Sequence, residues 1–454
     1  MRIKLSLAVC EGEVDSDPEP LLTLELDSRP SIETLGLSLA NGKAALAQLQ
    51  SQIVKRQIEL ISKSQRRCDA CGLNRAVKDY HEVHYRSLFG RVAVRVPRWQ
   101  RCACSAPAEI AIHRRPWLSA ELEYVQSRLA ATIPYARSSE LLELLLPVAA
   151  ANAPSTVREH TLRIGRRLDA QGLKPRPEVA SMASKSNVTT VGLDGGYLRL
   201  CHPDEEKSFE VVAGRAMRVD VGQRSVAFVR TVDPNSHERV RGVLAAFGQH
   251  DSSMEVFTDG EIQLRQWQLS TLPRARHILD WYHLRRRVEK LNALVHGRPT
   301  ASQLRTADHD WLSGLVGGLK WRLWHGRAQE ATRRLAVMLY VLGKSTACRK
   351  PAARQIRKLT LELLGYLRNN SDSLPNYGRR YRAGRRISSA FVESAVNQII
   401  DKRMSKSQQM RWDQRSAHLL LQVRVRVVDG QLRDDFARWY PAFPSNDPTL
   451  SLLA

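Results

Sequence analysis

The sequence has no long apolar segment and few cysteines. No stretch approaches the roughly 20 consecutive apolar residues of a membrane span, and the apolar run Leu5–Val9 is too short for a signal peptide. We therefore expect a cytoplasmic protein with no membrane partner. The seven cysteines are an odd number in a chain of 454 residues, and four of them are clustered, which argues against a secreted disulfide framework.

Acidic residues are also in short supply. The chain has 46 Asp and Glu against 70 Lys and Arg, which leaves a formal net charge of +24. Such an excess calls for a polyanionic partner, and nucleic acid is the obvious candidate. Local peaks of positive charge lie at 285–287, 379–380 and 385–386. Each peak could also be a solvated helix face.

The clustered cysteines form two short-spaced pairs at the ends of a predicted β-hairpin. Cys68-x2-Cys71 precedes a strand-rich stretch with Gly90 at its turn, and Cys102-x-Cys104 follows it. Two such pairs can converge on one tetrahedral zinc ion, with Zn–S distances of about 2.3 Å. We therefore predict structural zinc in a zinc-ribbon-like module. Four free cysteines in a small β-subdomain are the alternative, and a histidine could replace one thiol. The candidate histidines are His81, His84 and His113.

The segments around this module have their own patterns. Two alternating runs within 1–30 predict a hairpin, and apolar residues at helical spacing over 33–62 predict a long helix. Further along, 138–168 predicts two helices joined by a turn, the second capped by Ser155. This pair resembles a DNA-binding helix-turn-helix, although a plain helical pair explains the pattern equally well. The candidate DNA contacts in the second helix are Arg158 and Arg163.

A polar linker over 171–187 precedes a region in which strands and helices alternate. The patterns predict three strands, a helix, a strand, a helix, a strand and a helix, which is the order of the RNase H-like α/β fold. In that fold the first and fourth strands lie side by side, so carboxylates at their ends face each other. Asp194, on or just past the first strand, and Asp259, at the end of the fourth, occupy those two places.

A third carboxylate is expected from a later helix packed beside the sheet. The segment 389–404 carries an apolar stripe, while Glu393 and Asn397, four residues apart, share another face. We predict that Glu393 points toward the sheet edge and completes a site with Asp194 and Asp259. Three such carboxylates would bind two Mg²⁺ ions, or Mn²⁺ in their place, about 3.5 to 4 Å apart. This arrangement catalyses phosphoryl transfer.

Several words of the sequence resemble a known family. They are VGLDGGYLR, FTDGE, LDWYHL, LKWRLWHG, LPNYGRRYRAGRRISSAFVESAVNQIIDKRMSKSQQMRW and FARWYP. They resemble a bacterial insertion-sequence transposase family, the Kra-type group, which is related to Mutator-like DDE transposases. The resemblance runs through nearly the whole chain. It implies that Asp194, Asp259 and Glu393 are a catalytic, metal-binding triad.

The resemblance carries two further expectations. The motif Asp280-Trp281-Tyr282-His283 resembles one that Mutator-like enzymes carry after the fifth strand, in which an acid or a cysteine is followed by two residues and a histidine. Residues three apart on a first helical turn share a face, so Asp280 and His283 could contact DNA phosphate or a catalytic water. A capping Asp with a structural His is an equal alternative. The stretch 284–375 resembles an all-helical insertion, with tryptophans that we expect in its core rather than stacked on bases. They are Trp311, Trp321 and Trp324.

These patterns together predict how the chain is organised and what it does. We expect a DDE-type DNA transposase that binds terminal inverted repeats and target DNA as double strands, cleaves and joins them, and acts as at least a dimer. A basic run before the Glu393 helix is expected to contact phosphates. Its residues are Arg379, Arg380, Arg385 and Arg386. A further amphipathic helix over 415–426 is expected to pack under the sheet.

The predicted parts are a hairpin and helix (1–63), the zinc-ribbon-like module (64–115), a helical DNA-binding region (116–186), the RNase H-like domain (187–283 and 376–454) and the helical insertion (284–375). Two other functions remain open at this point. One is a structure-selective nuclease on the same fold, and the other is a domesticated DNA-binding regulator without catalytic activity.

Overall fold

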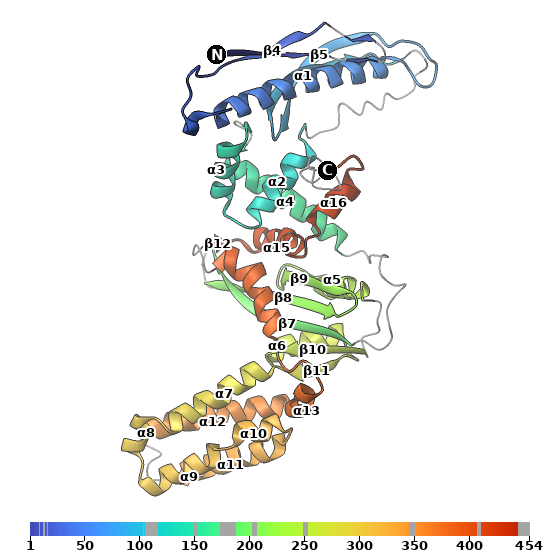
Figure 1. Cartoon of the computed structure of the whole chain (residues 1–454). Coiled ribbons are helices and arrows are strands. Elements are labelled where there is room, and N and C mark those ends of the chain that lie inside the picture. The colour runs from blue at the N-terminus through green and yellow to red at the C-terminus, as the bar shows by residue number, and fades with distance from the viewer. Residues whose placement is uncertain are drawn as a thin grey trace. The chain divides into compact units, whose positions relative to one another are not determined.

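A computed structural model of the chain describes all residues except 9, 12–13, 16, 103, 105–116, 149–151, 173–187, 202–206, 248–252, 345–349, 406–409 and 444–454. His113 and most of the expected linker thus lie outside the described residues. The chain divides into two units, Met1–Gly165 with Gly430–Ala454, and Arg166–Asp429 (Figure 1). Within the described residues, no helix has the length and apolar character needed to cross a membrane.

The first unit begins with the expected hairpin and long helix. Strands β1 (Arg2–Leu7) and β4 (Glu19–Glu25) pair antiparallel, with the short strands β2 (Cys10–Glu11) and β3 (Val14–Asp15) between them in sequence. Helix α1 (Leu39–Arg66) starts later than predicted, because Ser38 caps it by accepting the N–H of Asn41 at 3.1 Å. Ahead of it lies only a short 3₁₀ turn, η1 (Ile32–Thr34).

The predicted second hairpin is confirmed. Strands β5 (Val77–Ser87) and β6 (Gly90–Trp99) pair antiparallel over their length. Gly90 has a φ of +118°, which explains why the turn needs glycine. The buried side chains of the hairpin, Val83, Val92, Val94 and Val96, pack with Val54 of α1.

Three helices follow, α2 (Ala120–Ala130), α3 (Tyr135–Leu145) and α4 (Pro154–Gln171). The expected cap at Ser155 is wrong. Helix α4 starts at Pro154, whose missing N–H costs nothing in the first turn, so Ser155 lies inside the helix. Helix α16 (Leu432–Trp439) returns to this unit, where the ring of Phe436 lies 5.3 Å from that of Tyr124 on α2.

The second unit is built on a mixed sheet. Its strands are β7 (Thr189–Leu200), β8 (Ser208–Arg218), β9 (Gly222–Val229), β10 (Met254–Thr258) and β11 (Arg276–Leu279). They lie in the order β11-β10-β7-β8-β9, in which β7, β8 and β9 are antiparallel neighbours and β10 is parallel to both β7 and β11. The predicted order of elements, and the pairing of the first strand with the fourth, are therefore confirmed.

One strand was not expected. The two residues of β12 (Arg411–Trp412) pair parallel with the far end of β7, at Arg199 and Leu200. The indole N–H of Trp412 donates to the carbonyl of Met404 at 3.1 Å, which holds β12 against the preceding helix. A pair of residues is too short to show strand periodicity, so the sequence alone does not reveal it.

Helices cover both faces of this sheet. One face, with Val191 and Leu193 of β7, packs against α5 (Ser236–Ala245) and α6 (Ile262–Thr271). The other face meets α14 (Ala390–Val396), and α15 (Gln414–Val428) packs along β9. The predicted helix under the sheet is thus confirmed.

The helix that carries Glu393 differs from the expected single α-helix. After α14 it continues as a π-helix, η7 (Asn397–Ser405). The buried guanidinium of Arg424 on α15 donates to the carbonyls of Gln398 and Ile399 in the π-helical turn. Those contacts come from a helix distant in sequence and stabilise a register that local propensity disfavours.

The expected all-helical insertion is also present. Its helices are α7 (Trp281–Val295), α8 (Arg298–Gln303), α9 (Thr306–Val316), α10 (Leu319–Trp324), α11 (Ala328–Lys344) and α12 (Pro351–Asn369), followed by η6 (Ser371–Ser373) and α13 (Tyr377–Arg382) (Figure 1). Their core is continuous with Ile278 and Leu279 of β11. Trp324 packs in it, 5.0 Å from the ring of Trp281, but Trp311 and Trp321 are 38% and 61% exposed, so the core expectation is wrong for these two.

At Gly192 the sheet and α14 lie in close contact. A Cβ atom at Gly192 would lie 1.8 Å from Cγ2 of Val392. We expect Gly192→Ala to lower the free energy of unfolding by about 3 kcal/mol, because the helix must shift to make room. In the matched control, Gly314→Ala on α9, the new methyl meets nothing within 4 Å, and stability should rise by about 0.5 to 1 kcal/mol. Urea unfolding of both variants checks this, and equal stabilities would contradict it.

Candidate active site and metal centre

Asp194 and Asp259 lie at the same level on neighbouring strands. In the parallel pairing of β7 with β10, Gly192 is opposite Phe257. Continuing this register by two residues along both strands places Asp194 opposite Asp259. Asp194 shares its strand face with Gly192 and Gly196, the two positions where α14 and η7 cross β7 through Val392 and Ile400. This register brings the two aspartates together as predicted, and Asp194 lies on β7, one of its two expected placements.

The surroundings of Asp194 disfavour its negative charge. Burial raises the pKa of Asp194 to about 6, and the negative charge of Asp259 contributes to the rise. Asp259 directs Oδ1 at the N–H of Glu261, 2.9 Å away, across the turn at Gly260, where φ is +84°. Two neighbouring carboxylates offer the oxygen ligands that a hard divalent cation prefers.

Asp280 is buried, caps α7 and also accepts a hydrogen bond from the start of α14. Its carboxylate is fully buried and accepts the N–H groups of Tyr282 (3.0 Å), His283 (3.3 Å) and Ser389 (3.0 Å). Burial acts to raise the pKa of Asp280, but the hydrogen bonds from His283 and these N–H groups outweigh it and lower the pKa. The capping alternative is therefore confirmed for Asp280, whose oxygens are committed to the fold.

His283 lies beside the two aspartates. Its Nδ1 is 2.5 Å from Oδ2 of Asp280, so Nε2 is the ring atom left for other partners. The hydrogen bond to Asp280 raises the pKa of His283, and the charges of Asp280, Asp194 and Asp259 add to the effect against that of burial. The side chain is about one third exposed. A partly exposed imidazole held in one orientation next to two carboxylates can donate to a phosphate or exchange a proton with water.

Glu393 sits on the helix that crosses the aspartate face of β7. It is exposed in the first turn of α14, directly after Val392, which contacts Gly192. The N–H of Glu393 bonds to the carbonyl of Ser389 at 3.0 Å, and the N–H of Ser389 donates to Asp280. The start of this helix is thus tied to the same carboxylate that orients His283.

Residues of the insertion that the sequence did not single out hold the Asp259 turn. The hydroxyl of Tyr366 donates to the carbonyl of Asp259 at 2.5 Å, and Asn370 donates to the carbonyl of Gly260 at 3.3 Å. Tyr366 lies on α12, 107 residues from Asp259 in sequence, and Asn370 follows the last residue of that helix. A tyrosine and an asparagine on or beside an amphipathic helix carry no local signal for such a role.

Two of the arginines expected to contact DNA are structural. Arg380 is 5% exposed and donates to both carboxylate oxygens of Glu255, at 2.9 and 2.6 Å. Arg163 donates to the buried Glu123 at 2.9 Å. The expectation for these two is corrected, because each neutralises a buried carboxylate that would otherwise be costly. Arg385 also bonds to Glu255 but stays 42% exposed. The other exposed members of the expected set are Arg158, Arg379 and Arg386.

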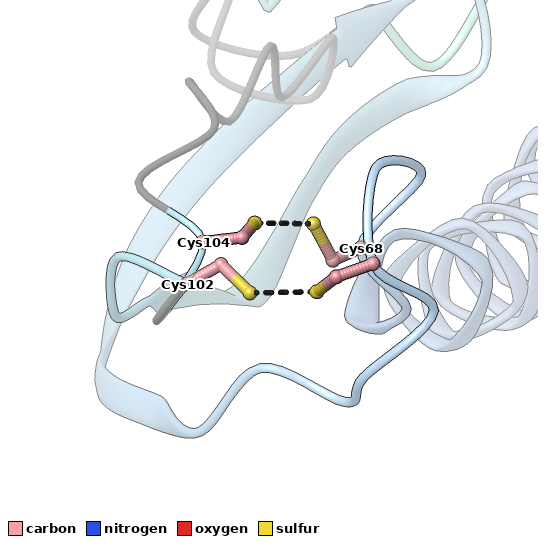
Figure 2. A group of neighbouring side chains, drawn as sticks. Cys68, Cys102 and Cys104 are labelled. Atoms are coloured by element: carbon pink, nitrogen blue, oxygen red, sulfur yellow. Dashed lines mark hydrogen bonds between the residues drawn. The ribbon is translucent and has the colours of Figure 1, made fainter.

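The four cysteines come together in the first unit. Cys68 Sγ lies 3.6 Å from Cys104 Sγ, and Cys71 Sγ lies 3.2 Å from Cys102 Sγ (Figure 2). All four sulfur atoms lie within 4.8 Å of one another, close to the roughly 3.8 Å that Zn–S bonds of about 2.3 Å would impose. The group could therefore hold a metal such as zinc. His81 and His84 are not part of it.

Comparison with known proteins adds no family to this geometry. No protein-family model matches the sequence, and no curated protein matches it significantly.

The cysteine group predicts a measurable metal content. We expect the purified chain to contain about one zinc ion, because four thiolates close a tetrahedral site. Cys68→Ser should lose most of that zinc and lower the melting temperature, since the metal would join the two ends of the β5–β6 hairpin. Cys201→Ser, outside the group, is the control. Elemental analysis and thermal melting check this. Full zinc content in Cys68→Ser would exclude the site.

The buried His277 predicts a pH dependence of stability. It bridges Thr258, just before Asp259, and Ser373, through contacts of 2.8 and 2.6 Å. Burial, aided by the charge of Arg265, lowers the pKa of His277 to about 3. Below pH 6.5, His277 is therefore protonated in the unfolded chain but stays neutral in the folded chain. The free energy of unfolding falls from pH 6.5 toward pH 3 by at most about 1.4 kcal/mol per pH unit.

We expect His277→Gln to be less stable than the native chain at pH 7.5 and to lose less stability on acidification. Urea unfolding at pH 7.5, 6.5, 5.5 and 4.5 measures both slopes. Parallel slopes of the free energy of unfolding against pH for the two proteins would show that His277 is protonated at the same pH in the folded and unfolded states.

Proposed function

We propose that this protein is a DDE-type DNA transposase with an RNase H-like catalytic domain. The observation that carries the proposal is the level position of Asp194 and Asp259 on adjacent parallel strands, on the sheet face that the Glu393 helix crosses. The strand order β11-β10-β7-β8-β9, with three antiparallel strands followed by two parallel ones, supports the assignment to the RNase H-like fold. The resemblance of the sequence words to insertion-sequence transposases supports the same function.

The three carboxylates and His283 would have different roles. Asp194, Asp259 and Glu393 would hold two Mg²⁺ ions, for which Mn²⁺ could substitute. Bound there, the ions would activate the attacking hydroxyl and stabilise the leaving 3′ oxygen. His283, oriented by Asp280, would donate to a phosphate oxygen or pass a proton to water. No covalent enzyme intermediate is required, because water attacks first and the liberated 3′-OH then attacks target DNA.

The partner would be double-stranded DNA, both the terminal inverted repeats and the target. The net charge of +24 supports binding to phosphates. Joining two element ends requires at least two copies of the chain in the active complex. The zinc module and the helices of the first unit would contribute to recognition of the repeats.

The test is strand cleavage and joining on a labelled duplex that ends in the element's own repeat, with Mg²⁺. We expect the native chain to cut and join. Asp194→Ala, Asp259→Ala and Glu393→Ala should each bind the duplex and lose at least about 100-fold in rate, because each removes a metal ligand. Glu362→Ala, an exposed carboxylate on α12, is the matched control and should keep its activity.

Other outcomes identify other functions. Hydrolysis without joining would indicate a structure-selective nuclease, and binding without cleavage would indicate a regulator. Full activity in any one of the three variants would remove that residue from the metal site.

A further inference from the structure

The start of α7 carries three consecutive arginines that differ in their partners. Arg285 donates to Glu289 at 2.7 Å, so its charge is neutralised on the helix surface. Arg286 lies over the ring of Tyr282 and Arg287 over the ring of Tyr366. Within the described part of the chain, neither Arg286 nor Arg287 has a carboxylate partner. Both side chains are exposed.

Arg287 is held close to the candidate active site. Its guanidinium carbon is 4.3 Å from the centre of the Tyr366 ring, and the hydroxyl of that ring bonds to the carbonyl of Asp259. Stacking on an aromatic face fixes the plane of a guanidinium and leaves its N–H edges for other acceptors. The ring of Tyr366 thus joins the main chain of one proposed metal ligand to an exposed cation.

The helical period aligns these cations with His283. Residues three, four and seven positions after His283 share its side of α7, and they are Arg286, Arg287 and Lys290. At 1.5 Å per residue the stripe from His283 to Lys290 is about 10 Å long, comparable to the axial rise of about three nucleotides in one DNA strand. It starts at His283, whose pKa the negative charges of Asp194 and Asp259 help to raise.

We propose that Arg287 and Arg286 form a phosphate-binding site for the DNA strand on one side of the scissile bond, with Arg287 preorganised by Tyr366. This rests on the proposed function. The planar guanidinium donates two parallel N–H groups to phosphate oxygens. Its charge also offsets the repulsion between the DNA backbone and the two aspartates. Neither arginine transfers a proton, so both are binding residues.

The experiment measures DNA affinity without cleavage. A fluorescent duplex that ends in the element's repeat is titrated with the full chain, without added Mg²⁺, over a series of NaCl concentrations. We expect Arg287→Ala and Arg286→Ala each to weaken binding about tenfold and to reduce the slope of log affinity against log salt by about 1. Arg287→Lys should keep the slope and recover part of the affinity. Arg285→Ala, the neighbour paired with Glu289, should change neither quantity.

The outcomes separate this inference from the proposed function. Native affinity and slope in Arg287→Ala would overturn the inference, whether or not the native chain cuts DNA. If Arg287→Ala loses affinity while the native chain binds the duplex but never cleaves it, the phosphate-binding site is supported and the proposed transposase function is wrong. Thermal melting verifies that each variant is folded, and Arg287→Gln replaces the alanine variant if the latter unfolds. A native chain that does not bind the duplex would overturn both.

Discussion

The buried carboxylate of Asp280 is the constraint on which the candidate site depends. A carboxylate with no exposed surface must satisfy its lone pairs inside the protein, and Asp280 does so with the first turn of α7, with the ring of His283 and with the N–H of Ser389. One side chain thereby connects the end of β11, the start of the helical insertion and the start of the helix that carries Glu393. The relative positions of His283 and α14 follow from this one set of hydrogen bonds.

The sheet adds a second constraint, which is steric. Gly192 and Gly196 flank Asp194 on one face of β7, and the side chains of Val392 and Ile400 occupy the space that two Cβ atoms would need. The helix can therefore lie close to the strand, with an aspartate between its two points of contact. Close packing on both sides partly desolvates the carboxyl of Asp194, which is the main reason why its pKa is raised. The same packing that completes the core therefore makes the charged form of Asp194 less favourable.

The helical insertion takes part in the site rather than merely interrupting the domain. Tyr366 and Asn370 hold the carbonyls of Asp259 and Gly260, and His277 bridges the end of β10 to Ser373 after α12. The hydrophobic core of the insertion includes Phe257, two residues before Asp259. A disturbance of the insertion would therefore reach the turn that carries one of the two paired aspartates.

The sequence by itself determined the order of strands and helices, the adjacency of β7 and β10, and the two cysteine pairs, because periodicity, turn residues and short spacings are local. Only the tertiary structure decided which charges are free. Arg380 and Arg163, indistinguishable in sequence from surface arginines, are bound to Glu255 and Glu123. It also decided that η7 is π-helical and that Tyr366 serves the Asp259 turn. These features arise from contacts between residues far apart in the chain, and the cost of leaving a buried polar group unpaired selects among them.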